Sequence, residues 1–170
     1  AIKKIATVPN ISSPSSLQLN NKDQVAFIDY KAQEDKGKAK IYLYESGSTI
    51  RIIEIEPEIW STGGLQFNDN GQIVFSSIIY WNAPSDIYFY DGTSITSITA
   101  NLILSGYSSL NDQGQLAFEG VNTKEQQSDV YLFDGKSIHN ITEKLNAWAT
   151  HPSLNGEGQI AFVVTDESMG

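Results

Sequence analysis

The sequence predicts an all-β protein, a β-propeller of four-stranded antiparallel blades. Three observations predict it: a nine-residue motif that occurs four times, a spacing near 45 residues between its copies, and strands that are apolar on both faces. Repeats with a period of about 20 to 50 residues are typical of architectures that stack one supersecondary unit on the next. Such units bury their apolar faces against one another.

The repeated motif is a turn followed by an apolar strand. Its copies read LNNKDQVAF, FNDNGQIVF, LNDQGQLAF and LNGEGQIAF, and they align on Gln24, Gln72, Gln115 and Gln159. Steps of 48, 43 and 44 residues separate these glutamines. Asn and Gly in the turn supply the positive φ angles that a tight hairpin needs. Each copy therefore predicts a hairpin between a first strand (A) and a second strand (B).

A second hairpin follows in the first three repeats. An aromatic strand (C) reads IYLY, IYFY or VYLF, a turn reads ESGS, DGTS or DGKS, and a last strand (D) carries Ile-x-x-Ile. Asp-Gly between two apolar runs is a strong hairpin signal. A sheet with one wet face would alternate apolar and polar residues. The C strands do not, so we expect both faces of each sheet to be covered, as in a propeller.

The repeats divide the chain into one propeller segment, 1–170. We place the repeats at about 15–56, 63–100, 107–143 and 151–170, with a leading D strand at 2–8. A β-trefoil is the alternative, but it has three repeats and this chain has four copies of the A–B hairpin. Residues 165–170 are too few and too polar for a C strand. We therefore expect three full blades and a half blade, with the rest of a larger ring supplied by a longer chain or a second copy.

The repeat resembles a known family. LQFNDNGQIVF followed by DIYFYDGTSITSIT is similar to the TolB-type, WD40-like propeller repeat. The family's Asp-aliphatic-Tyr element recurs at 86–88 and 129–131, and its Ile-Thr ending recurs at 98–99 and 141–142. In the turn, the family's Ser-Pro-Asp-Gly is replaced by Asn-Asp-Asn-Gly or similar. The resemblance implies a binding or scaffolding propeller, extracellular or periplasmic, and it carries no catalytic residue across.

Composition and motifs exclude several functions. The net charge is −9 and Arg51 is the single arginine, which disfavours nucleic acid and anionic membranes. No apolar run approaches the roughly 18 residues of a membrane-spanning helix. Without cysteine there are no disulfides or thiolate metal sites. H-E-x-x-H, G-x-S-x-G and P-loop motifs are absent. We therefore expect no enzyme activity, no cofactor and no bound metal.

The remaining polar residues have structural interpretations. We expect His139 to face solvent on a D strand, and His151 to lie in a D–A loop, THPS. The turn carboxylates Asp69 and Asp112 lack the six to eight oxygen ligands of a calcium site. Turn geometry accounts for them, and the recurring glutamines are expected to tie a loop to the neighbouring strand.

Candidate binding residues gather on one face. Strand direction alternates, so the D–A and B–C loops lie on one face and the uniform hairpins on the other. The loops of the first face vary between repeats, and variable loops on a rigid scaffold commonly carry binding. The aromatic and histidine candidates there are Trp60 and Trp148 in D–A loops, Trp81 in a B–C loop, and Tyr80, Tyr107 and His151 nearby. Trp60 and Trp148 occupy equivalent positions, so packing between blades remains open for them.

These residues predict a non-enzymatic propeller that recognises a protein or a glycan through the D–A/B–C loop face. Tryptophan and tyrosine are favoured contact residues in interfaces. Two alternatives remain. The first is a sugar-binding lectin propeller, with tryptophans stacked on sugar rings. The second is the accessory propeller of a larger hydrolase.

Overall fold

The computed structural model describes residues 14–30, 39–45, 49–54, 61–78, 86–99, 102–122, 127–145 and 147–165. Within these ranges the backbone forms strands and turns, and no helix occurs. None of these residues therefore belongs to a helix long and apolar enough to cross a membrane. The leading strand predicted at 2–8 lies outside the described residues.

The strands form four antiparallel sheets, which we call blades 1 to 4 in chain order. Blade 1 contains β1 (Pro14–Leu19), β2 (Val25–Tyr30), β3 (Ala39–Glu45) and β4 (Thr49–Glu54). Blade 2 contains β5 (Ser61–Phe67), β6 (Ile73–Ile78), β7 (Asp86–Tyr90) and β8 (Ile95–Ser97). Blade 3 contains β9 (Leu102–Leu110), β10 (Leu116–Asn122), β11 (Ser128–Phe133) and β12 (Ile138–Asn140). Blade 4 contains β13 (Trp148–Leu154) and β14 (Ile160–Thr165).

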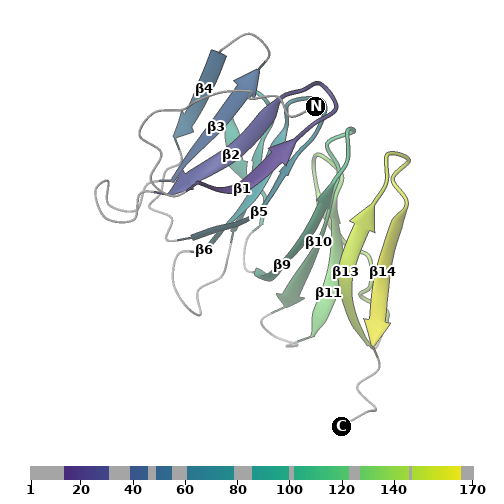
Figure 1. Ribbon diagram of the computed structural model, residues 1–170. Coiled ribbons are helices and arrows are strands. Elements are labelled where there is room, and N and C mark those ends of the chain that lie inside the picture. Colours follow the sequence, from purple (N-terminus) through teal and green to yellow (C-terminus); the bar gives the residue numbers. More distant parts are fainter. Residues whose placement is uncertain are drawn as a thin grey trace.

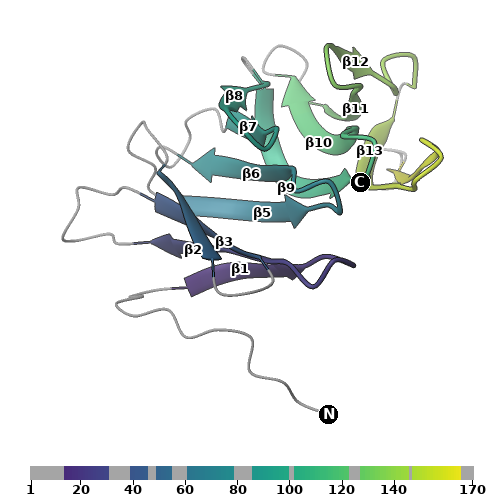
Figure 2. The same ribbon diagram turned by 90° about the horizontal axis from the view of Figure 1, so that it is seen from above.

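The blades are arranged side by side around their first strands (Figures 1 and 2). Strands within each blade follow chain order, and each neighbouring pair is antiparallel. The first strands β1, β5, β9 and β13 contact one another in succession. They form the inner side of the molecule, while the fourth strands lie outside. This arrangement confirms the predicted β-propeller architecture and not the trefoil.

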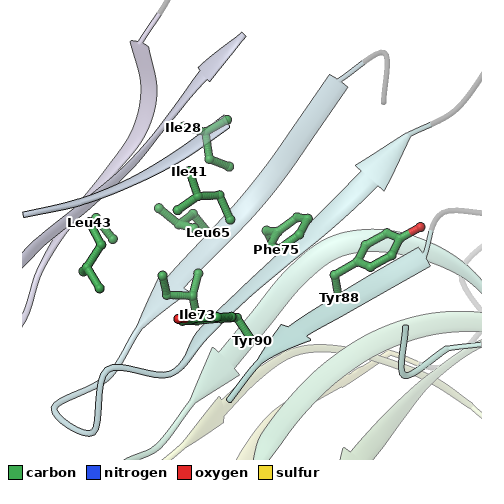
Figure 3. Close-up of a cluster of buried hydrophobic side chains, with 9 residues drawn as sticks. Ile28, Ile41, Leu43, Leu65, Ile73, Phe75, Tyr88 and Tyr90 are labelled. Atoms are coloured by element: carbon green, nitrogen blue, oxygen red, sulfur yellow. The ribbon is translucent and has the colours of Figure 1, made fainter. Parts of the chain in front are cut away.

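Apolar side chains fill the space between neighbouring blades. Figure 3 shows Ile28, Ile41 and Leu43 of blade 1 facing Leu65 and Phe75 of blade 2, and each of these five is at most 2% exposed. A second cluster joins blades 2 and 3 in the same way. Blade 2 is therefore covered on both sides by its neighbours, which explains why its C strand, β7, carries no polar alternation.

Aromatic pairs recur at equivalent places within the blades. The second-strand phenylalanine stacks on a third-strand tyrosine in each complete sheet. The pairs and their ring-centroid distances are Phe27–Tyr42 at 5.0 Å, Phe75–Tyr88 at 5.3 Å and Phe118–Tyr131 at 5.5 Å. Offset stacking of this kind contributes about 0.5–1.5 kcal/mol beyond burial of area. The repeated Phe and Tyr are therefore packing residues.

The repeated asparagine closes its own turn and joins the next blade. Asn68 Oδ1 accepts hydrogen bonds from the backbone N–H groups of Asn70 and Gln72, at 3.1 and 3.0 Å. Its Nδ2 donates to Gln72 Oε1 at 2.7 Å and to the carbonyl oxygen of Asn111 in blade 3 at 2.9 Å. The glutamine is thus bound to the asparagine of its own turn, and the predicted tie to a neighbouring strand was wrong.

The same bonds repeat along the molecule. Nδ2 of Asn20 donates to the Asn68 carbonyl at 3.1 Å, and Nδ2 of Asn111 donates to the Asn155 carbonyl at 3.1 Å. We call these four asparagines and their turns the asparagine turn layer. All four make the bonds within their own turn. The layer holds the hairpin ends of successive blades at fixed spacing.

Aspartates add a second set of bonds to this layer. Asp69 accepts from the backbone N–H of Asn21 at 2.8 Å and from its side-chain amide at 3.0 Å. These bonds, the side-chain one first, hold the pKa of Asp69 below its usual 3.8. The Asp69 N–H donates in turn to Asp112 Oδ1 at 2.8 Å. The turn carboxylates therefore join blades, and none of the described residues forms a group of three metal-ligating side chains.

Candidate functional site

Each first strand carries a β-bulge at the same repeat position. The residue eight places before the turn glutamine is Ser16, Gly64, Tyr107 or His151. In blades 1, 2 and 4 two residues of the first strand stand opposite one residue of the second. In blade 3 residues 105–107 stand opposite Glu119. A bulge bends its strand and re-aims side chains, and bulges are over-represented beside functional sites.

The backbone at this position is left-handed in blades 1, 2 and 4. Ser16, Gly64 and His151 have φ angles of 53°, 64° and 55°. A positive φ costs a residue with a Cβ about 1–2 kcal/mol, and histidine is among the types enriched there. Despite this cost the position has a different residue in every blade, and two of these residues are ring-bearing.

The two ring-bearing residues are in contact. The centroids of the Tyr107 and His151 rings are 3.9 Å apart, with 37° between the ring planes. Tyr107 is 50% exposed and His151 is exposed. These rings form an accessible aromatic surface on the inner strands β9 and β13, where blades 3 and 4 meet.

A buried carboxylate lies beneath this ring pair. Glu119 is 6% exposed, and its Oε2 accepts the backbone N–H of His151 at 3.2 Å. Its Oε1 accepts the Ser128 hydroxyl at 3.0 Å, and that hydroxyl lies 3.3 Å from the Ala149 carbonyl oxygen. A buried carboxylate is tolerated when hydrogen bonds satisfy it. Glu119 therefore fixes the bulge that presents the His151 ring, and we call Tyr107, Glu119, Ser128 and His151 the inner-strand cluster.

Sequence reasoning missed Glu119, although the repeat contains the signal. Counted from the turn glutamine, the equivalent residues are Ile28, Ser76 and Val163. Ile28 is fully buried in the core between blades. A carboxylate at a position that another blade fills with isoleucine breaks the pattern of apolar residues. Such a departure indicates a site-specific role.

A small hollow lies on the other side of Tyr107, between blades 2 and 3. It encloses about 10 Å³, and its lining includes Gly64, Ser76, Tyr107, Ser108 and Glu119. Small-molecule pockets generally enclose about 300–1,000 Å³. The hollow is therefore about the size of one water molecule and is no ligand pocket.

Two larger hollows lie in the asparagine turn layer. One encloses about 300 Å³ between blades 1 and 2 and the other about 260 Å³ near the inner ends of all four blades. The second is lined by the residue that precedes the turn asparagine in each blade, namely Leu19, Phe67, Leu110 and Leu154. Because its lining repeats from blade to blade, we interpret it as a consequence of the packing geometry.

The structure describes half of the candidates from the sequence. Trp60, Tyr80 and Trp81 lie outside the described residues. Trp148 and His151 were predicted in a loop, which was wrong: both belong to β13, where Trp148 pairs with Thr165 and is 37% exposed. The bulge explains the error, because a bulge admits Pro152 into the strand. His139 is solvent-facing as predicted, with its Nε2 3.0 Å from Asp134 Oδ2 and 53% of its side chain exposed.

Hydrogen bonds around Asp134 show how the outer hairpins are stabilised. Its Oδ1 accepts the backbone N–H groups of Ser137 and Lys136, at 2.8 and 2.9 Å. These bonds, followed by the bond from His139, lower the pKa of Asp134 from 3.8 to about 2. The carboxylate is therefore ionised at neutral pH and acts as a turn stabiliser, away from the inner-strand cluster.

No protein-family model matches the chain, and no curated protein matches it in sequence. Solved structures do match it. Pyrococcus horikoshii acylaminoacyl peptidase gives a TM-score of 0.65 at 15% identity, covering 95% of this chain and 30% of that one. The β-propeller domain of the Trilobed protease from Pyrococcus furiosus gives 0.60 at 17%, covering 91% and 50%. TolB from Acinetobacter baumannii gives 0.57 at 18%, covering 92% and 39%.

These likenesses establish the fold class as a β-propeller. The identities are low, so they extend to the fold alone. The chain spans half or less of the length of each of these three structures.

Proposed function

We propose that this chain is a non-enzymatic binding module that recognises a polypeptide or a glycan. The exposed Tyr107–His151 pair carries the proposal, because its two rings come from the bulge position, where each blade has a different residue. Binding would involve the inner-strand cluster together with the neighbouring D–A and B–C loops. The candidates Trp60, Tyr80 and Trp81, together with Trp148 on β13, would extend the same contact surface.

The physical properties of the cluster suit recognition. Aromatic rings offer a large contact area for a small loss of side-chain entropy, and they stack on sugar rings as well as on side chains. The N–H of His151 is already fixed by Glu119 before any ligand arrives. A site that is pre-organised in this way pays less of the ordering cost of binding.

The setting of this function is also a proposal. An extracellular or periplasmic location follows from the resemblance to TolB-type repeats, and the net charge of −9 supports a protein or carbohydrate partner over nucleic acid. A second candidate function is that of an accessory propeller within a larger peptidase. The likeness to an acylaminoacyl peptidase and to a protease propeller domain favours it.

The proposal is tested with two probes, a glycan array and a displayed library of random peptides, each exposed to the labelled chain. Sugar hits would indicate a lectin propeller, and peptide hits would suit a protein-binding or peptidase-accessory role. The variants Tyr107→Ser and His151→Gly use residues that the repeat itself places at this position. We expect each to weaken the selected interaction about tenfold, the loss of one aromatic contact.

The matched control is Leu17→Ser, which alters a side chain that is 69% exposed in blade 1. It should leave binding unchanged. Ligands that bind the Tyr107→Ser and His151→Gly proteins as tightly as the parent would place recognition elsewhere and overturn the proposal.

A further inference from the structure

The second strand of blade 4 differs from its counterparts in having one partner strand within the part of the chain that the structure describes. The strands β2, β6 and β10 each pair with a first strand on one edge and a third strand on the other. Among the described residues, β14 pairs with β13 alone. Its other edge presents backbone N–H and C=O groups to an incoming strand. Figure 1 shows β14 on the outer side of the row of blades.

The complete blades define what pairs with such an edge. The residue after the turn glutamine stands opposite an aromatic residue, and the phenylalanine two places later stands opposite a tyrosine. The first set is Val25–Tyr44, Ile73–Tyr90 and Leu116–Phe133. The second set is Phe27–Tyr42, Phe75–Tyr88 and Phe118–Tyr131, the stacked pairs described above. In blade 4 the corresponding residues are Ile160 and Phe162.

The side chains of β14 are more exposed than their counterparts. Phe75 and Phe118 are 0% and 1% exposed, whereas Phe162 is only half-buried. Val163 is 50% exposed at the position where Ile28 is fully buried, and the adjacent Val164 is 47% exposed. An exposed apolar strand with an unpaired edge is a template for strand addition.

We propose that the edge of β14 binds a β-hairpin whose first strand has the order aliphatic, Tyr, any residue, aromatic. The incoming strand pairs antiparallel with β14. Its tyrosine stacks on Phe162, and its last aromatic residue lies opposite Ile160. The surface continues an interface that the protein already uses three times, and a strand without the tyrosine would leave Phe162 uncovered.

The protein's own hairpin 128–142, SDVYLFDGKSIHNIT, is a suitable probe. It carries its own turn, in which Asp134 binds two backbone N–H groups. Its two strands are also joined at the open end, where the Val130 N–H donates to Thr142 Oγ1 at 3.0 Å and Thr142 Oγ1 donates to Asp129 Oδ1 at 2.8 Å. These bonds favour the hairpin conformation in the isolated peptide.

The experiment measures binding of this synthetic peptide to the 170-residue chain by fluorescence anisotropy. We expect saturable one-to-one binding. A peptide carrying Tyr131→Ser should bind about 2- to 10-fold more weakly, the range expected for one stacked aromatic pair. Phe162→Ser in the chain should weaken binding of the parent peptide by a similar factor. The parent and Tyr131→Ser peptides should then bind this variant with nearly equal affinity. Leu19→Ser, which changes a 60% exposed residue of blade 1, is the matched control and should have no effect.

Hydrogen exchange locates the bound peptide. In an antiparallel ladder every second residue of a strand bonds to a given neighbour. Peptide binding should therefore slow exchange at alternate amides of β14 and leave β1 unchanged. Because the Tyr131→Ser comparison uses the unaltered chain, it remains informative even if Phe162→Ser fails to fold.

Three results would overturn the proposal. One is the absence of saturable binding, and another is equal affinity for the parent peptide and a scrambled peptide of the same composition. The third is a concentration-dependent dimer of the chain alone. Val163→Lys would dissociate this dimer, and the peptide would not compete with dimer formation. That result would make a second copy the occupant of the β14 edge.

Discussion

The asparagine turn layer and the inner-strand bulge repeat with the same period, but residue identity is constant in the first and varies from blade to blade in the second. Asn and Gln are the same in all four turns. The bulge position holds a different residue in each blade, namely Ser16, Gly64, Tyr107 and His151. Repeats within one chain share one architecture, so they act as an internal alignment. Positions that keep their residue serve the shared architecture, and positions that change are available for recognition.

The contacts explain the difference. An asparagine in the turn layer uses both amide hydrogens and its oxygen, as Asn111 does with Gln113, Gln115 and Asn155. No other side chain supplies that set of donors and acceptor at that length. The bulge requires a backbone conformation and little else, because its side chain is exposed in blades 3 and 4.

The largest expected effect tests the turn layer. Asn111 is 5% exposed, and Asn111→Ala removes its bonds within the turn and its bond to blade 4. Loss of several partly buried hydrogen bonds should lower the free energy of unfolding by about 2–4 kcal/mol. Urea unfolding followed by tyrosine and tryptophan fluorescence provides the measurement.

Asn155→Ala is the matched control for this prediction. Asn155 makes the same bonds within its own turn but is exposed, and its turn precedes no further described blade. We expect its cost to be about 1 kcal/mol. Equal losses of unfolding free energy in the two variants would show that the bonds between blades do not stabilise the protein. The structural role given to the asparagine turn layer would then be wrong.

A smaller effect is expected where turns of adjacent blades touch. Gly114 has a φ of +77°, and a Cβ built on it would lie 3.0 Å from the Gln72 side chain. Gly71 has a φ of +76° with nothing within 4 Å of its Cβ position. Both alanine variants incur the cost of a left-handed backbone, about 1–2 kcal/mol. Gly114→Ala must also displace Gln72, and we expect it to cost about 1 kcal/mol more than Gly71→Ala by thermal unfolding.

Glu119 shares a property with each region. It is buried like Asn111 of the turn layer, but a glutamate occurs at its repeat position in blade 3 alone. Glu119→Ala leaves the His151 N–H without its acceptor. The expected loss is about 1–3 kcal/mol, the cost of an unsatisfied buried donor. Glu119→Gln keeps an acceptor oxygen, so its free energy of unfolding should stay near that of the parent. A Gln variant as unstable as the Ala variant would assign the stabilisation to the negative charge and not to the hydrogen bond.

The sequence predicted the fold better than the site, and particular residues show why. Regular spacing of Gln24, Gln72, Gln115 and Gln159 was enough to predict four A–B hairpins. The bulge was not predictable, because a two-for-one register shift leaves no mark in an apolar pattern that already varies. It placed His151 in a strand instead of a loop. The contact between Tyr107 and His151 joins residues 44 positions apart, and it depends on two adjacent bulges having nearly the same height along their strands.

His151→Gly should have the smallest effect on stability. In contrast to Asn111→Ala, it should affect binding more than the free energy of unfolding. Glycine accepts a φ of 55° without strain, which offsets its larger loss of backbone entropy. The backbone N–H that binds Glu119 is retained, and the ring contact with Tyr107 is lost. These contributions nearly cancel, so the free energy of unfolding should change by less than about 1 kcal/mol while binding at the inner-strand cluster weakens about tenfold. A cost above about 2 kcal/mol would mean that the His151 ring is a packing residue. The variable position would then be structural as well, and the distinction between the two regions would disappear.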